Sequence, residues 1–178
     1  MKARTSTLIC AMSLPLAMAL AAGPASARTY TFTQTGYDGG GSVSGTFDAV
    51  DVDGNGQISS FAGEVTGYSM SFSGDSLVGA FSHGFGDFFG LVYDVGSGKI
   101  GDGAGGDIEG VASNYLGSIG FGYASGLGPT GGLGGSVIDF ASGAISSTGE
   151  LVTVVPAPAT WALLVAGLVP LMLRRKGA

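Results

Sequence analysis

The chain has 178 residues and a formal net charge of −6 at pH 7, and all thirteen acidic residues lie in 28–154, where only Arg28 and Lys99 are basic. This body has a formal charge of −11 and no basic patch to contact phosphates, which excludes nucleic acid as a partner. The single cysteine, Cys10, precedes the body, so the body has neither an internal disulfide nor a cysteine-containing zinc site.

The N-terminus has the three parts of a secretory signal peptide. Two basic residues start the chain, residues 8–22 are apolar, and Ala25-Ser26-Ala27 is a cleavage site of the A-x-A type. We therefore expect export through the Sec machinery, removal of residues 1–27 and a single mature domain formed by residues 28–154.

Apolar and polar residues alternate with a period of two along much of the body, which predicts β-strands. Glycine makes up roughly a quarter of the body and favours tight turns over helices. The sequence thus predicts an all-β fold, an antiparallel β-sandwich. The expected strands are 29–33, 42–49, 65–72, 88–95, 108–116, 118–123, 136–140 and 144–154. Parts of the glycine-rich segments 96–106 and 125–135 are expected to be long loops.

The segment Asp51-Val52-Asp53-Gly54-Asn55-Gly56-Gln57-Ile58-Ser59 places oxygen donors at alternate positions around a glycine turn. Calcium needs six to eight oxygens, and this segment resembles the first nine positions of an EF-hand loop. The resemblance implies a calcium site with these ligands: Asp51, Asp53, Asn55, Gln57 and Ser59. The twelfth position is Ala62 instead of Glu, and Glu64 reaches the loop only if the intervening chain is not helical. Because a hairpin turn uses the same residue types, a turn without calcium is the alternative.

No other motif of the body indicates catalysis. His83 is the only histidine, and although Ser82 and Asp87 are close in sequence, no Gly-x-Ser-x-Gly elbow accompanies them. We therefore expect a protein that is not an enzyme. The acidic segment 101–109 is interpreted as a loop in preference to a second calcium site. Several aromatic residues are better suited to the core than to sugar stacking, namely Phe81, Phe85, Phe88, Phe89 and Tyr93.

The last 24 residues combine a proline motif, an apolar run and a basic end. Residues 159–173 would form a helix about 22 Å long, which is short for a bilayer core that needs roughly 20 apolar residues. Together these features resemble a PEP-CTERM sorting signal, with Ala157 where the motif usually has Glu. The residues that carry the resemblance are Val155, Pro156, Ala157, Pro158, Ala159, Thr160, Trp161, Arg174, Arg175 and Lys176.

The resemblance implies recognition and cleavage by exosortase, a membrane protease-transpeptidase of Gram-negative bacteria that make exopolysaccharide. Together with the signal peptide, it leads us to expect a protein that is held briefly in the inner membrane by its C-terminal helix and then passes to the cell surface or matrix. A structural or interaction role in the biofilm envelope follows, with exopolysaccharide or other surface proteins as partners. The alternative is a calcium-stabilised module that binds carbohydrate or protein.

Overall fold

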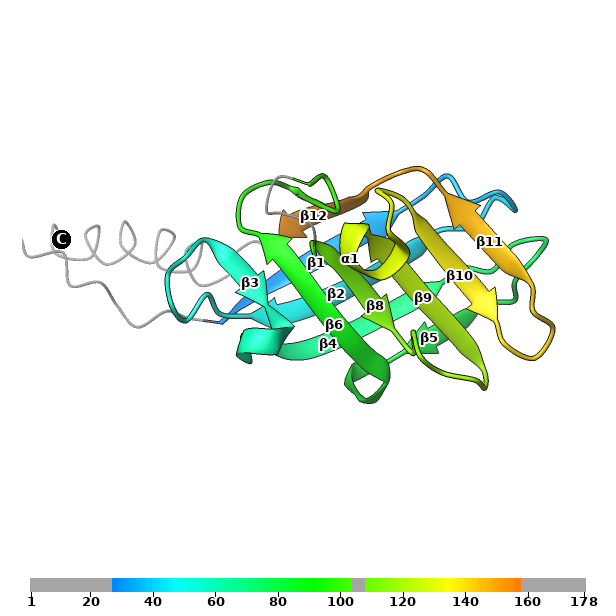
Figure 1. The fold of residues 1–178 in the computed structure, drawn as a ribbon, viewed down its shortest axis with the longest axis horizontal. Helices are drawn as coiled ribbons and strands as arrows, with labels where there is room; N and C mark the ends of the chain where they lie inside the picture. The colour runs from blue at the N-terminus through cyan, green and yellow to red at the C-terminus, as the bar shows by residue number, and fades with distance from the viewer. Residues whose placement is uncertain (1–26, 104–107, 158–178) are drawn as a thin grey trace, which may run out of the picture.

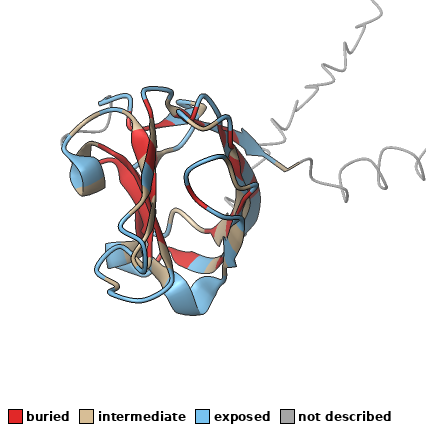
Figure 2. Cartoon of the chain, turned by 90° about the vertical axis from the view of Figure 1, so that its right-hand side faces the viewer, coloured by how far each residue is buried: buried red, intermediate tan, exposed pale blue. Residues whose placement is uncertain are grey.

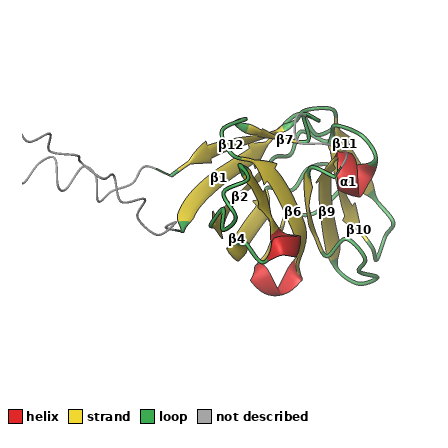
Figure 3. Ribbon diagram, turned by 60° about the vertical axis from the view of Figure 1, so that its left-hand side comes forward, coloured by secondary structure: helices red, strands yellow, loops and turns green. Residues whose placement is uncertain are grey.

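The computed structural model describes residues 27–103 and 108–157, so the expected signal peptide and most of the expected sorting signal lie outside the described residues. The described chain is all-β, with twelve strands in two antiparallel six-stranded sheets. Its helical segments are single turns at the rims of the sheets (Figure 3), namely η1 (Ser60–Ala62), η2 (Phe85–Asp87) and α1 (Leu127–Thr130). No helix in this part of the chain is long and apolar enough to cross a membrane.

The two sheets are formed by strands from both halves of the chain (Figure 1). Sheet A has the spatial order β5 (Phe81–His83), β4 (Val65–Phe72), β2 (Val43–Ala49), β1 (Arg28–Gln34), β12 (Val152–Pro156), β7 (Lys99–Ile100). Sheet B has the order β11 (Ile145–Thr148), β10 (Gly135–Asp139), β9 (Phe121–Gly126), β8 (Gly110–Ser113), β6 (Phe88–Asp94), β3 (Gln57–Ser59). All strand pairs are antiparallel, as the sequence predicted.

The core lies between the two sheets and is rich in aromatic rings. Along β1 the alternation of the sequence turns Tyr30 and Phe32 inward and the threonines outward. The Tyr30 ring stacks on Phe47 of β2 at a centroid distance of 4.9 Å and meets Tyr93 of β6 edge-on at 5.6 Å. Figure 2 shows the buried residues on the strands that enclose this interior. Such ring pairs contribute about 0.5–1.5 kcal/mol each beyond the area they bury.

One buried polar network also joins the sheets. The side chain of Gln34, at the end of β1, donates to Ser125 Oγ of β9 at 2.9 Å and to the backbone carbonyl of Glu150 at 2.7 Å. Its oxygen accepts hydrogen bonds from the hydroxyls of Tyr37 at 2.8 Å and Tyr123 at 3.0 Å. Every polar atom of this side chain is therefore satisfied, which removes the main cost of burying it.

The structure differs from the sequence-based expectation in several segments. Residues 144–154, expected as one strand, contain β11 of sheet B and the first part of β12 of sheet A. Of residues 125–135, only a part is loop, because β9 ends and β10 begins within them and α1 lies between. Residues 96–106 include the short strand β7. The strand expected over 118–123 begins only at Phe121, since a bend with Gly120 at φ +75° precedes it.

Candidate metal centre

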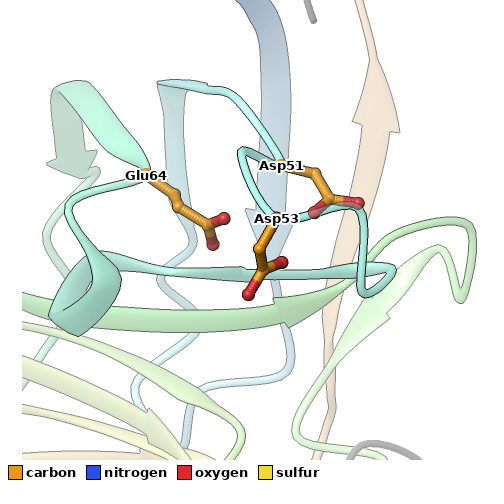
Figure 4. A group of neighbouring side chains, drawn as sticks. All are labelled: Asp51, Asp53 and Glu64. Atoms are coloured by element: carbon orange, nitrogen blue, oxygen red, sulfur yellow. The ribbon is translucent and has the colours of Figure 1, made fainter.

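The candidate site lies where the chain crosses between the sheets. Strands β2 and β4 are neighbours in sheet A, but β3, which lies between them in sequence, belongs to sheet B. The outward crossing carries Asp51 and Asp53, and the return crossing carries Glu64. Because Ala49 at the end of β2 is opposite Val65 at the start of β4, the outward crossing leaves sheet A next to the point where the return crossing rejoins it. Figure 4 shows Asp51, Asp53 and Glu64 side by side at this place. Antiparallel pairing therefore brings these acidic residues together.

The loop of the outward crossing is folded by its own acidic side chains. Asp51 Oδ2 accepts a hydrogen bond from the Gly56 amide at 3.0 Å, and Asp53 Oδ1 accepts one from the Asn55 amide at 3.1 Å. Gly54 and Gly56 have φ values of +70° and +82°. These are left-handed conformations that glycine adopts without steric cost. The Asp-x-Asp-Gly-Asn-Gly pattern is thus the local cause of the turn.

Glu64 reaches the loop because the intervening chain is short and reverses direction. After β3, the single turn η1 ends at Gly63, whose φ of +77° turns the chain back toward the loop. The Glu64 side chain is only 2% exposed. Its two oxygens accept hydrogen bonds from the Val52 and Ser59 amides, both at 2.8 Å. The path to Glu64 contains the single 3-10 turn η1 and no longer helix, and the left-handed Gly63 after it lets Glu64 reach the loop.

The other expected ligands have different partners. The Asn55 side-chain oxygen accepts a hydrogen bond from the Gln57 amide at 2.7 Å, and its amide nitrogen donates to Asp53 at 3.0 Å. The Gln57 side chain donates to Asp94 of β6 at 3.1 Å. Ser59 lies in β3, where its amide donates to Glu64. The structure thus brings Asp51, Asp53 and Glu64 together, Asn55 helps to fold the loop, and Gln57 and Ser59 belong to strand β3.

The three carboxylates form an arrangement suited to a hard cation. Asp51, Asp53 and Glu64 each offer one oxygen, and these oxygens lie within 4.8 Å of one another. Asp51 Oδ1 is buried and has no hydrogen-bond partner within the described protein. A buried carboxylate oxygen without a partner is costly. Calcium binds carboxylate oxygens and completes its shell with carbonyls or water, so the residues fit that ion.

The residues around His83 are not arranged as a catalytic triad. His83 Nδ1 contacts Ser113 Oγ of sheet B at 2.7 Å, and Ser113 is fully buried. Ser82 instead shares a hydrogen bond with Ser71 at 2.8 Å on the outer face of sheet A. Burial lowers the pKa of His83, although the nearby Asp87 carboxylate opposes that shift. The histidine therefore links the edge strand β5 of sheet A to the inner strand β8 of sheet B.

The remaining sequence candidates fall in two groups. Of the aromatic residues assigned to the core, Tyr93 is part of it and Phe81 and Phe88 pack against it. Phe85 and Phe89 are instead exposed, at 52% and 46%. Of the sorting motif, Val155 and Pro156 end strand β12 and Ala157 follows it, whereas the motif residues from Pro158 onward lie outside the described part of the chain.

Comparison of the chain with protein-family models, with curated proteins and with solved structures produced no match. The geometry of the candidate site and the patterns in the sequence are therefore the basis for the functional argument.

Proposed function

We propose that this protein is an exported, non-enzymatic surface or matrix protein whose β-sandwich binds one calcium ion at Asp51, Asp53 and Glu64. The convergence of these three carboxylates, with Asp51 Oδ1 buried and unpartnered, carries the calcium proposal. The ion would join the two crossings between the sheets and offset the repulsion among the carboxylates. Its proposed role is structural, because the ion would tie the loop that follows β2 to the segment that precedes β4.

The affinity we expect is low. Asp53 is exposed to solvent, Glu64 already accepts two backbone hydrogen bonds, and a bidentate Glu at the twelfth loop position is absent from the sequence. Extracellular calcium modules have dissociation constants of about 10⁻⁴–10⁻³ M. An exported protein meets calcium at such concentrations, so weak binding is compatible with the proposed location.

Calcium binding is tested by thermal unfolding of residues 28–157 in chelator and in 10 mM calcium. For a dissociation constant of about 1 mM, linkage gives roughly 1.4 kcal/mol of added stability, a rise of a few degrees in melting temperature. Asp51→Asn removes the unpartnered carboxylate and should abolish the rise. Asp38→Asn removes an exposed carboxylate from another loop and should preserve it. An unchanged melting temperature in the wild type, or an equal rise in Asp51→Asn, would contradict the proposal.

The export and sorting proposal is supported by the signal peptide at residues 1–27 and by the motif, apolar run and basic end of residues 155–178. Fractionation of cells with and without exosortase tests it. We expect a smaller form at the surface or in the medium when exosortase is present, and a full-length form in the inner membrane when it is absent. The same size in the same fraction of both strains would refute the sorting role.

One observation favours the second candidate function, a calcium-stabilised module that binds a partner. Large apolar side chains gather around a hollow on the outer face of sheet B instead of packing in the core. A solvent-exposed apolar hollow is typical of an interaction site.

A further inference from the structure

The hollow on sheet B is an apolar cleft of about 240 Å³. It lies over β6 and β8, on the side away from the core. Leu91 and Tyr93 point into the core, so the intervening Val92, which lines the cleft, faces outward. Five side chains, here called the cleft wall, surround it: Phe61, Phe89, Ile108, Tyr115 and Pro129.

The floor of the cleft is open because it consists of residues with little or no side chain. Gly90, Gly110 and Ala112 form it. The Phe61 ring, carried by η1, lies against Gly90, where a Cβ would come within 3.0 Å of the ring. On the other side Pro129 of α1 sits directly on Gly110; Figure 1 shows α1 in front of β8 and β9. Two single helical turns therefore bracket a flat apolar floor.

The cleft wall remains exposed although its side chains are apolar. Phe61 is 72% exposed and Ile108 is 60% exposed. The Phe89 and Tyr115 rings lie 5.7 Å apart and are tilted toward each other by 55°. Burying such side chains in a complex is favourable by about 25 cal/mol per Å². Aromatic residues in a concave patch are the usual anchors of protein interfaces.

Size and polarity restrict the occupant. A cavity of about 150 Å³ accepts a benzene molecule, so 240 Å³ has room for a larger aromatic side chain. The cleft wall offers a sugar few polar partners, because the Tyr115 hydroxyl already donates to the Pro129 carbonyl and the other four wall side chains are apolar. The cleft therefore suits an aromatic side chain better than a saccharide.

The charge around the cleft determines what flanks that side chain. Residues 57–62, 85–98 and 108–151, which include all of sheet B, have no lysine or arginine. Two acidic residues adjoin the cleft: Asp87 is exposed and lies two positions before Phe89, and Asp94 follows Val92 on the same face of β6. A negative field of this kind attracts basic segments and repels acidic ones.

We propose that the cleft docks a polypeptide segment of a partner protein that inserts an aromatic side chain between Phe61 and Tyr115 and carries basic residues on both sides of it. This inference rests on the proposed interaction role, but it does not require calcium. If calcium fails to bind, the cleft is still present. If the segment fails to bind, the calcium and sorting proposals are unaffected.

Titration of residues 28–157, which contain both sheets and the described core, with capped peptides tests the proposal. The chain's only tryptophan, Trp161, lies outside this range, so the indole of a Gly-Lys-Trp-Lys-Gly peptide reports binding by its fluorescence. We expect a blue shift and a dissociation constant below 1 mM. Phe61→Ala, at a mostly exposed side chain, should weaken binding at least tenfold. Ile119→Ala is the matched control, because Ile119 is 84% exposed and does not line the cleft.

Two further peptides separate the contributions of the ring and the charge. Replacement of the tryptophan by alanine should abolish binding, as followed by chemical-shift changes, and replacement of both lysines by glutamate should weaken it at least tenfold. Equal binding of the alanine peptide would show charge attraction alone and overturn the proposal. No binding of the tryptophan peptide up to 5 mM would also overturn it. The proposal would also be overturned if a neutral cello-oligosaccharide, and not the peptide, bound the wild type and this binding were lost in Phe61→Ala.

Discussion

Gln34 is the residue whose polar contacts connect the two sheets through the core. Burial raises the pKa of Tyr37 and of Tyr123, so both hydroxyls stay protonated and donate to the Gln34 oxygen. A glutamine amide offers both donors and acceptors, and Gln34 uses them all. An alternating strand pattern predicts an inward side chain at this position but does not predict that it is polar.

We expect Gln34→Leu to lower the free energy of unfolding by about 3 kcal/mol, because it leaves the buried Tyr123 and Ser125 hydroxyls with fewer partners. Urea unfolding of residues 28–157 measures the change. Tyr37→Phe removes only one hydrogen bond of the same network and should cost about 1 kcal/mol. A loss below 0.5 kcal/mol for Gln34→Leu, on the order of experimental error, would mean that water replaces the network.

Glu109 makes the stability of the folded protein fall as the pH rises, which is the opposite of the usual effect of a paired carboxyl group. Its side chain is fully buried, Oε1 has no hydrogen-bond partner in the described structure, and Oε2 accepts a long hydrogen bond of 3.3 Å from the Gly103 amide. Burial raises the pKa of this carboxyl, and the neighbouring Asp102 and Asp94 raise it further. Backbone hydrogen bonds from Gly101 and Gly103 lower the pKa of this carboxyl but do not outweigh its burial. The folded state therefore binds a proton at this carboxyl more tightly than the unfolded state does.

A raised carboxyl pKa means that the folded state binds more protons than the unfolded state above the ordinary pKa of about 4.5. The contribution of Glu109 to stability therefore falls as the pH rises from there to the folded pKa, and it stays low above it. We expect Glu109→Gln to be more stable than wild type at pH 7, and the difference to vanish below pH ~4. Melting temperatures across this range test it. A variant less stable than wild type at pH 7 would show that the carboxylate has a stabilising partner.

The candidate metal centre shows how far sequence reasoning extends at this scale. Asp51 and Asp53 follow from a motif of adjacent residues, since their spacing and the glycine turn are visible in the sequence. The position of Glu64 beside them cannot be derived from that motif, because it depends on the length of β3, on η1 and on the left-handed Gly63. These are properties of the chain path, and a spacing rule taken from a helical loop misses them.

Glycines inside the strands are used for packing as well as for turns. Gly45 of β2 is opposite Phe32 of β1 and Met70 of β4. A Cβ atom at Gly45 would overlap the Phe32 ring and the Ser69 carbonyl oxygen. The missing side chain thus provides the space in which the fully buried Phe32 ring lies.

We expect Gly45→Ala to lower the free energy of unfolding by about 1–3 kcal/mol, because the added methyl group overpacks the sheet. Gly149→Ala is the matched control, since a Cβ there meets no heavy atom within 4 Å and the residue has no positive φ. The control should be neutral or slightly stabilising because alanine restricts the unfolded chain. Denaturant midpoints of both variants decide the question. Equal changes in the free energy of unfolding for the two variants would show that the Phe32 ring moves aside for the added methyl group at no cost.

The sequence predicted the strands that are long enough to show an alternation of apolar and polar residues. The seven- and eight-residue strands β1, β2, β4 and β6 coincide closely with the expected segments. Strands β3, β5 and β7 have three, three and two residues, which is too few for an alternation to appear. They form because longer neighbours offer unpaired backbone groups, and only the tertiary fold specifies those neighbours.

On the scale of the whole molecule, the first and last strands of the described chain pair with each other. Strand β12 pairs with β1, so the start and the end of the described sandwich lie side by side (Figure 1). Pro156 is opposite Tyr30, and the Ala157 amide donates to the Thr29 carbonyl at 2.8 Å. The first residues of the expected sorting motif are therefore also the last residues of the sheet. A protease that cuts within the motif preserves the strand only if it cuts beyond Ala157.

Because residues 155–157 belong both to the expected sorting motif and to the end of the folded sheet, we expect a domain that ends at 154 to be less stable than one that ends at 157. The shorter chain loses Val155 and Pro156 from β12 and the hydrogen bond from Ala157 to Thr29. Each net hydrogen bond contributes about 0.5–1.5 kcal/mol, so we expect a loss of about 1–2 kcal/mol and a melting temperature several degrees lower. Val155→Ala in the longer chain is the control. It removes a side chain that is 57% exposed but keeps the backbone, and should change stability by less than about 0.5 kcal/mol. Identical melting curves for the two lengths would place the end of the folded domain before Val155.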